Sequence, residues 1–598
     1  MDNNKQGGWN SFRGIGFDKR AVLRRIKKAE LASTRHARRF LLGRLENAKL
    51  VRKEISLWAI LVGLIIAGMG VQLGMSQQGY MTTAPKSGGT YAEAMLGPLT
   101  SLNPLYASSS AETSLGRLVF SSLYNYDSTG RLHQDLATKL SVGDGGKTYT
   151  LSIRKDAKWH DGEPLTAKDI AFTVNLIKNP ASRAAALRMN WVDVTVRAVD
   201  DYTVEFKLPA ISAAFPHALT FPVLPVHILA NVNAGALRES PFSQAPVGSG
   251  PFEFKLLQRA DAITNHEVVH LVANEKYYGG RPKLDQFEIY AYSNQADIRT
   301  ALKGNEINGA VDVSNVTADD IKGNYAVAAA PLDTGVYAIF NNLNPILSNQ
   351  KVRKALQVGT DYAKVRQVAG GQVQPLSLPF IDNQIWGDVP KLPALNTAQA
   401  AVMLDDAGWK LNGAVRYKDS TPLALTITTT KDPQYIAAAG ELKQQWESLG
   451  VKANVLTVDA TSVSAGFVQN VLQARNFDVL VYQLLIGADP DVYAYWYSSQ
   501  IGQSGFNFAN YSNKNADAAL ASARSRSEPE LRNAKYVAFA RQWLEDAPSL
   551  ALYRPVVEYV SNKNDSAVMP NTQLVSMTDR YSNILYWSVG TESVYKTP

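Results

Sequence analysis

The segment His266–His270 reads HEVVH, which satisfies the H-E-x-x-H pattern of zinc proteases. That chemistry needs both histidines on one helical turn as zinc ligands, with the glutamate between them as the base. The surrounding segment Ile263–Ala273 is rich in β-branched residues, which favours a strand over a helix. A strand cannot place the glutamate and the two ligands in this way, so we expect no catalytic zinc here.

Other catalytic motifs are absent from the sequence. It contains no G-x-x-x-x-G-K-[ST] phosphate loop, no G-x-S-x-G nucleophile elbow, and seven histidines whose spacing suggests no triad. It contains no cysteine, which excludes disulfides, iron–sulfur clusters, a thiol nucleophile and a lipid anchor on cysteine. The sequence therefore predicts neither an enzyme nor a bound cofactor or metal.

Strand-like and helix-like segments alternate along residues 88–598. Apolar residues in period-2 or continuous runs predict the strands. Such alternation is typical of open α/β lobes rather than of an all-α or all-β body. The predicted strands include Tyr149–Arg154, Tyr202–Leu208, Gln286–Tyr292, Leu423–Thr428 and Phe477–Leu485, and the predicted helices include Ala167–Ile177, Gln350–Gly359, Thr397–Asp406, Tyr435–Leu449 and Asn515–Leu544.

One segment is apolar enough to cross a membrane. Leu57–Met75 contains no charge, spans roughly 28 Å as a helix, and has Trp58 near one end. Residues 1–54 hold 15 Lys and Arg against 5 Asp and Glu, whereas residues 76–85 are uncharged. The positive-inside rule then places the N-terminus in the cytoplasm and the rest outside. Because the basic stretch far exceeds a signal-peptide n-region, we expect an uncleaved signal anchor.

The net charge of +8 belongs to this N-terminal tail. Residues 55–598 hold 46 basic and 48 acidic side chains, a net of −2. A nucleic-acid-binding body would carry its own basic surface, so we expect no nucleic-acid partner. The tail either contacts anionic lipid, docks on a cytoplasmic partner, or only sets the topology of the anchor.

Ordered segments from about Gly88 to the C-terminus resemble those of a known family. The strongest match, Tyr149–Asp169 (YTLSIRKDAKWHDGEPLTAKD), also reads as a strand, an Asp-Gly turn and a capping box at Thr166. With it, the chain resembles the peptide and oligopeptide family of extracytoplasmic solute-binding proteins of ABC importers. The other matching segments are Gly88–Tyr91, Ser101–Pro104, Val119–Asp127, Pro246–Phe252, Asn274–Asp285, Leu302–Asp312, Phe340–Ala355, Asp489–Gln500 and Asn507–Asn513.

The resemblance implies a periplasmic-binding-protein type II fold, which is an α/β fold with two lobes, a hinge and an extra domain. One transmembrane helix precedes it. The implied division is a cytoplasmic tail (1–56), an anchor (57–75), a linker (76–87), a first lobe (88–122, 245–336 and 557–598), an extra domain (123–244) and a second lobe (337–556).

The resemblance also implies where a ligand is held. The loop Ser108, Ser109 and Ser110 is expected to line the cleft, and Asp489 to pair with the α-ammonium of a peptide. The structural alternative is that Asp489 or Asp491 only initiates a turn at Pro490.

Two aromatic residues, Tyr482 and Trp496, offer stacking faces to a ligand or belong to the core. At Ile486 many oligopeptide binders carry an aromatic residue instead, a departure that weakens the implication of a peptide ligand.

The implied function is capture of di- or oligopeptides by a monomer and their delivery to the permease subunits of an ABC importer. Closure of the lobes would bury the ligand. The alternatives are a membrane-tethered ligand sensor, an extracytoplasmic chaperone, or a binder of nickel, haem or an oligosaccharide.

Overall fold

The computed structural model describes residues 27–28, 52–188, 191, 193–260, 266–321, 323–370, 372–459, 466–503, 505–569 and 572–595. The chain forms two compact units, one of residues 85–592 and one of residues 1–84 with 593–598. The predictions made for the basic tail lie outside the described residues.

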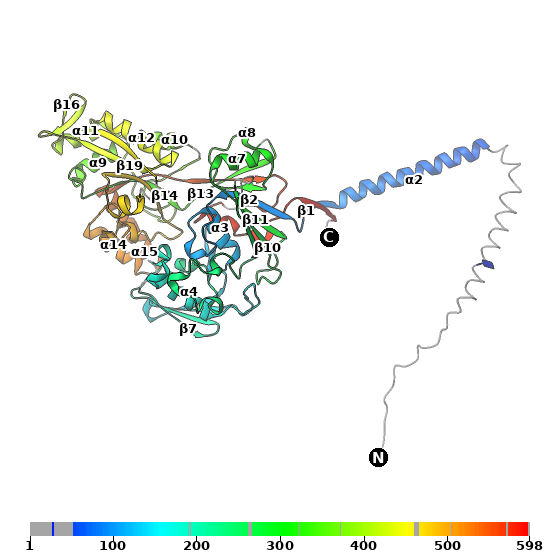
Figure 1. Cartoon of the computed structure of the whole chain (residues 1–598). Helices are drawn as coiled ribbons and strands as arrows, with labels where there is room; N and C mark the ends of the chain where they lie inside the picture. Colours follow the sequence, from blue (N-terminus) through cyan, green and yellow to red (C-terminus); the bar gives the residue numbers. More distant parts are fainter. Residues whose placement is uncertain are drawn as a thin grey trace, which may run out of the picture. The chain divides into compact units, whose positions relative to one another are not determined.

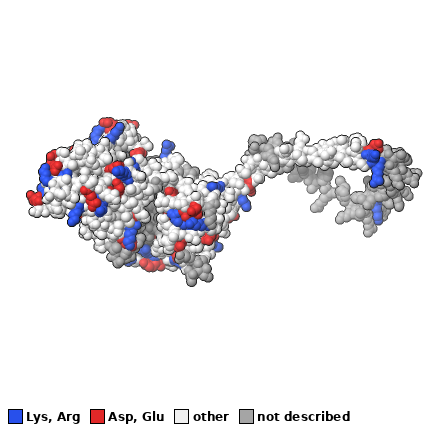
Figure 2. Space-filling model, turned by 90° about the horizontal axis from the view of Figure 1, so that it is seen from above, with Lys and Arg blue, Asp and Glu red and all other residues white. Residues whose placement is uncertain are grey.

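The predicted membrane segment lies within α2 (Arg52–Tyr80). Its part Arg52–Met75 has a mean hydropathy of 2.0 and is wholly exposed, and it is long and apolar enough to cross a bilayer. Figure 2 shows charge on this helix only at its beginning. The helix is followed by β1 (Met81–Pro85), which pairs with β24 (Thr591–Tyr595).

A seven-stranded mixed sheet forms the centre of the first lobe (Figure 1). Its central strand alternates between two faces, as period-2 strands do: Tyr91 and Met95 enter one core, whereas Ala92 and Ala94 enter another. The order of the strands is β13 (Tyr325–Pro331), β23 (Val556–Asn562), β12 (Gly309–Ala310), β2 (Thr90–Leu96), β11 (Gln286–Tyr292), β10 (His266–Ala273) and β9 (Phe252–Gln258).

A six-stranded sheet forms the centre of the second lobe, and it is buried on both faces. Val336, Ala338 and Phe340 join one core, and Tyr337 and Ile339 join the other. A strand buried on both sides reads as a continuous apolar run rather than as an alternating one. The order is β15 (Gln374–Pro375), β22 (Ser549–Arg554), β14 (Thr334–Phe340), β21 (Val479–Leu485), β19 (Ala424–Thr430) and β20 (Lys452–Val458).

A separate four-stranded antiparallel sheet is inserted in the first lobe, in the order β5 (Ala137–Gly143), β6 (Thr148–Ile153), β8 (Thr203–Lys207) and β7 (Thr195–Asp200). Smaller sheets join β3 (Tyr124–Tyr126) to β4 (Leu132–Gln134), and β16 (Lys410–Asn412), β17 (Val415–Lys418) and β18 (Thr421–Pro422). The residue bounds proposed for the lobes and the extra domain stay predictions.

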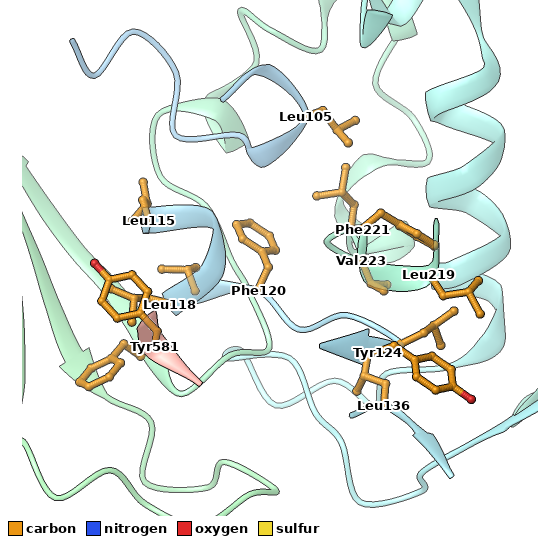
Figure 3. Close-up of a cluster of buried hydrophobic side chains, with 14 of the residues drawn as sticks. Leu105, Leu115, Leu118, Phe120, Tyr124, Leu136, Leu219, Phe221, Val223 and Tyr581 are labelled. Atoms are coloured by element: carbon orange, nitrogen blue, oxygen red, sulfur yellow. The ribbon is translucent and has the colours of Figure 1, made fainter. Parts of the chain in front are cut away.

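The four-stranded sheet shares one hydrophobic core with the first lobe. In Figure 3, Leu118 and Phe120 at the end of α3 (Ser110–Val119) lie in the same cluster as Leu219 and Phe221. The core clusters of the second lobe contain a different set of side chains. The inserted sheet and the first lobe are therefore packed as one body.

The chain passes between the two large sheets twice, at neighbouring points. Leu332 and Asp333 connect β13 to β14, and Pro555 connects β22 to β23, with Leu332 N donating to the Pro555 carbonyl at 3.0 Å. The Asp333 carboxylate is fully buried and accepts hydrogen bonds from Arg554 at 2.9 Å and from Gln573 at 2.8 Å. These two crossings form the hinge between the lobes.

Helices cover both large sheets (Figure 1). The expected single helix over Asn515–Leu544 is wrong: α14 ends at Arg524 and α15 begins at Pro529. Proline lacks an N–H and favours the first helical position, so it starts a new helix rather than continuing one. The other helices are α4 (Ala167–Lys178), α5 (Ala185–Arg188), α6 (Val226–Leu229), α7 (Gln295–Gly304), α8 (Ala318–Ile321), α9 (Gln350–Val358), α10 (Tyr362–Ala369), α11 (Thr397–Asp406), α12 (Pro433–Ser448), α13 (Tyr493–Trp496), α14 (Lys514–Arg524) and α15 (Pro529–Asp546).

The HEVVH segment is a strand, as predicted. It lies in β10, where His270 Nδ1 is 2.9 Å from the Glu288 carboxylate and Glu267 binds Arg259. Within the part of the chain that the structure describes, no three His, Asp or Glu side chains gather as metal ligands.

Candidate functional site

A cavity of about 860 Å³ is lined by two parts of residues 85–592 that lie far apart in sequence. The first wall consists of residues between Leu208 and Ala218, together with Tyr126, Lys147, Asp193 and Val194. The second wall consists of residues between Leu485 and Asp491, together with Tyr493, Gln500 and the end of α14. The volume lies within the range of about 300–1,000 Å³ that is usual for small-molecule and cofactor sites.

Asp489 lines this cavity and is held by an arginine from α15. Its two carboxylate oxygens accept hydrogen bonds from the two terminal nitrogens of Arg532, at 2.5 and 2.6 Å. Both side chains are largely buried, at 12% and 14% exposure. Burial alone would lower the pKa of Arg532, but the hydrogen bonds to Asp489 raise it above its ordinary value. The two side chains form a bidentate ion pair.

A second ion pair lies beside the first. Asp491 Oδ2 is 3.1 Å from Nε of Arg524, the last residue of α14, and the Arg524 guanidinium lies 4.5 Å from the centre of the Tyr493 ring. Burial raises the pKa of Asp491, and the positive charge of Arg524 opposes that rise. The second wall thus carries two carboxylates and two guanidinium groups.

His217, from the first wall, faces Asp489. Its Nε2 lies 3.8 Å from Asp489 Oδ2, and its Nδ1 shares a hydrogen bond of 2.9 Å with the Tyr126 hydroxyl. Burial lowers the pKa of His217, Asp489 opposes this, and Arg532 adds to it. A neutral imidazole is favoured, held in a fixed orientation by Tyr126.

The walls touch at one backbone hydrogen bond. Ala213 N donates to the Arg524 carbonyl at 3.1 Å. Tyr149 fixes the first-wall loop from behind, because its hydroxyl donates to the Ser212 carbonyl at 2.9 Å. The two walls are therefore joined by main chain at this point.

The arrangement is suited to binding a polar or charged ligand. It offers polar groups of both signs on two bodies that are joined by a hinge, and closure around a ligand is how such clefts work. Comparison with known proteins also indicates a binding protein. The model of the bacterial extracellular solute-binding proteins, family 5 (middle region), matches residues 131–505, which is more than half of the chain.

The chain belongs to family 5 of the bacterial extracellular solute-binding proteins.

Relatives of this family 5 protein include the oligopeptide-binding protein AppA of Bacillus subtilis, which is 29% identical over 491 residues, covering 79% of this chain and 87% of AppA. The structure of that AppA in complex with a nonapeptide covers 85% of this chain and all of its own, at 27% identity and a TM-score of 0.68. NikZ of Campylobacter jejuni in complex with Ni(L-His) covers 83% of this chain and 99% of its own, at 25% identity and a TM-score of 0.69.

These likenesses confirm the predicted family and the predicted fold class. The family 5 protein has the α/β fold of periplasmic-binding-protein type II, and its family consists of substrate-binding proteins of ABC transporters.

The predicted serine loop lies at the beginning of α3. Ser109 is the N-cap and accepts from the Glu112 backbone N–H, while Ser108 and Ser109 donate to the Glu112 carboxylate. Burial opposes ionisation of Glu112, but its many hydrogen bonds, those from Thr100 and Ser108 foremost, lower its pKa overall. Ser108, Ser109 and Ser110 are not among the residues that line the cavity. That they contact ligand stays a prediction.

The two predicted aromatic faces belong mainly to the core. Trp496 is 1% exposed and packs edge-on against Tyr337 and Trp543. Tyr482 is half-buried and packs on Phe467. In this conformation, Trp496 has no free face to offer.

The turn role of Asp489 is present in the structure, and its pairing with a ligand ammonium group stays a prediction. Asp489 lines the cavity, and its Oδ1 also accepts from Asp491 N at 3.0 Å, which stabilises the turn at Pro490. The sequence analysis did not predict Arg532, Arg524 or His217 as site residues. A signal existed for the arginines, since a buried carboxylate requires a positive partner, but their distance in sequence concealed which residues supply it.

Proposed function

We propose that this protein captures peptides in the cavity between the two walls and delivers them to the permease subunits of an ABC importer. The cavity is the observation that supports this proposal. Its two walls lie on opposite sides of the hinge, and the largely buried carboxylate of Asp489 lines it. The B. subtilis relative bound to a nonapeptide supports a peptide as the ligand.

The proposed role of Asp489 is to attract the α-ammonium group of the peptide. Each carboxylate oxygen has two lone pairs, and Arg532 uses one on each. Asp491 N occupies the second site on Oδ1, so Oδ2 keeps a site on the side where His217 stands. An ammonium group would take that site, and the first wall would move with it.

We also propose that α2 anchors the protein in the cell membrane with the binding lobes outside. Its apolar segment and the basic residues that precede it support this placement. An anchored binding protein stays at high local concentration near its permease.

The test is native mass spectrometry of the full chain, extracted from cells in mild detergent without added ligand. We expect a series of added masses that fragment into short peptides. Protein that stays bare, even after incubation with a mixed peptide pool, would count against a peptide ligand.

A nickel complex is the second candidate, because the C. jejuni relative binds Ni(L-His). The same spectra separate the two candidates, since a nickel complex adds one defined mass with the isotope pattern of the metal.

A further inference from the structure

Arg524 lies where the end of α14 meets the cavity. It ends α14, lines the cavity, and its side chain is 39% exposed. The Nε atom itself is buried and has no hydrogen-bond partner. The exposed share of the side chain therefore lies elsewhere, on its stem or on its terminal nitrogens.

The guanidinium is held in place without using its terminal donors. Tyr493 lies under it, with the ring centre 4.5 Å away, and Tyr493 is itself stacked on Tyr497 at 4.1 Å and 17°. Asp491 approaches from the Nε side. Among the residues that the structure describes, none accepts a hydrogen bond from the two terminal nitrogens. The stack orients the group and leaves its fork unoccupied.

The neighbouring arginine is different. Both terminal nitrogens of Arg532 bind Asp489, so its fork is occupied. Of the two guanidinium groups beside the cavity, Arg524 is the one whose fork is available to a ligand. A guanidinium fork matches a carboxylate in a bidentate manner and binds it more strongly than a lysine does.

From this geometry we infer that Arg524 binds a carboxylate of the ligand, so that the cavity selects peptides with an acidic group near the proposed ammonium site. This inference rests on the proposed function, because it names a second contact to the same peptide.

The position of Arg524 also places such a contact beside the first wall. Its carbonyl accepts the hydrogen bond from Ala213 on the first wall. A carboxylate bound to the side chain is thus held at the point where the two walls meet.

The carboxylate can come from the peptide C-terminus or from an acidic side chain. Four peptides distinguish these sources: trialanine, trialanine amide, and the tripeptide amides Ala-Glu-Ala and Ala-Gln-Ala. The experiment is isothermal titration calorimetry of the full chain in detergent, with wild type, R524Q and R526Q. Arg526 is the matched control, because it lies two residues further on, does not line the cavity, and binds Ser522 instead.

We expect the wild type to prefer either trialanine over its amide or the Glu peptide over the Gln peptide, by roughly ten- to a hundred-fold. R524Q should abolish that preference, and R526Q should keep it. Which pair shows the preference identifies the source of the carboxylate. Unchanged melting temperatures would show that both variants fold.

Three outcomes would overturn the inference. Equal binding of all four peptides by the wild type, or a preference that R524Q retains, removes the role of Arg524 and leaves the proposed function standing. If the wild type binds none of the peptides, the proposed function fails for short peptides, and this inference fails with it.

Discussion

Asp489 both lines the cavity and stabilises the turn at Pro490. A buried carboxylate needs a counter-charge, and Arg532 supplies one by binding both oxygens of Asp489. Such pairs add little net stability, but removing one partner costs about 3–5 kcal/mol because the other charge is left buried and unpaired. The pair is better understood as a device that keeps charge available inside the cavity.

Replacing Asp489 by Asn tests its proposed contact with the ligand. We expect binding of trialanine to weaken about ten- to a hundred-fold, because a charge-assisted hydrogen bond contributes roughly 1.5–3 kcal/mol. Binding of N-acetyl-trialanine, which lacks the ammonium group, should change little. Calorimetry on both peptides measures the difference.

D388N is the control for that experiment. It removes a carboxylate that is 94% exposed and lies outside the cavity lining, where it pairs with Arg541. An equal loss of both peptides in D489N would mean that the substitution only disturbs the cavity.

At the scale of elements, the break between α14 and α15 creates the charged wall. Arg524 ends one helix, and Arg532 lies in the first turn of the next, which Pro529 begins. Both arginines reach the turn at Asp489–Asp491. In one continuous helix, residues eight apart would be separated by about 12 Å along the axis. The interruption brings the two guanidinium groups to neighbouring carboxylates.

The helix α2 is the element that we expect to determine localisation. Full-length protein should remain with membranes after washing in high salt or alkaline carbonate, because about 20 apolar residues insert essentially irreversibly. A chain that begins at residue 84 should be released and should bind peptides as tightly as the full chain. Fractionation followed by immunoblotting measures this.

A chain that lacks only residues 1–50 is the matched control. It keeps α2 (Arg52–Tyr80) and should stay in the membrane fraction. Release of this variant would show that the basic tail, rather than the helix, holds the protein at the membrane.

At the scale of the whole molecule, the binding lobes consist of two bodies with separate hydrophobic cores. The four-stranded sheet and the first lobe share one core, and the second lobe has cores of its own. The two bodies are joined by the crossings at Leu332–Asp333 and Pro555. One wall of the cavity belongs to each body, so we expect a rotation at the hinge to open or close the site.

Asp333 makes the stability of this hinge depend on pH. Burial raises its pKa to about 6, although Gln573 and Arg554 counteract the rise. Between pH 4 and 6 the folded state then binds more protons than the unfolded state, so the free energy of unfolding falls as pH rises. This rise in the pKa of Asp333 corresponds to at most about 3 kcal/mol of stability.

The variant D333N should lack this contribution. As pH rises from 4 to 6, the wild type should therefore lose stability relative to D333N. Above pH 6, the difference between their unfolding free energies should stay constant. Urea titrations at several pH values measure it, with D388N as the control for net charge. A pH-independent difference would contradict the prediction.

Much of this molecule was determined by local sequence. The alternation of strands and helices, the strand at His266–His270, the apolar helix and the capping box at Thr166 all depend on neighbours a few residues apart, and the structure contains each of them. Ordered motifs along the chain were sufficient to indicate the family, because they preserve the order of these local elements.

The cavity was decided only by the tertiary structure. Asp489 was predicted from its motif, but its partner Arg532 lies 43 residues away, and His217 comes from the other body. The sequence did not decide whether Trp496 faces a ligand or the core, and packing places it in the core. Ser109 caps α3, and ligand contact by the serines at residues 108–110 stays a prediction. Side chains distant in sequence meet according to how the layers pack, and local pattern carries no record of that packing.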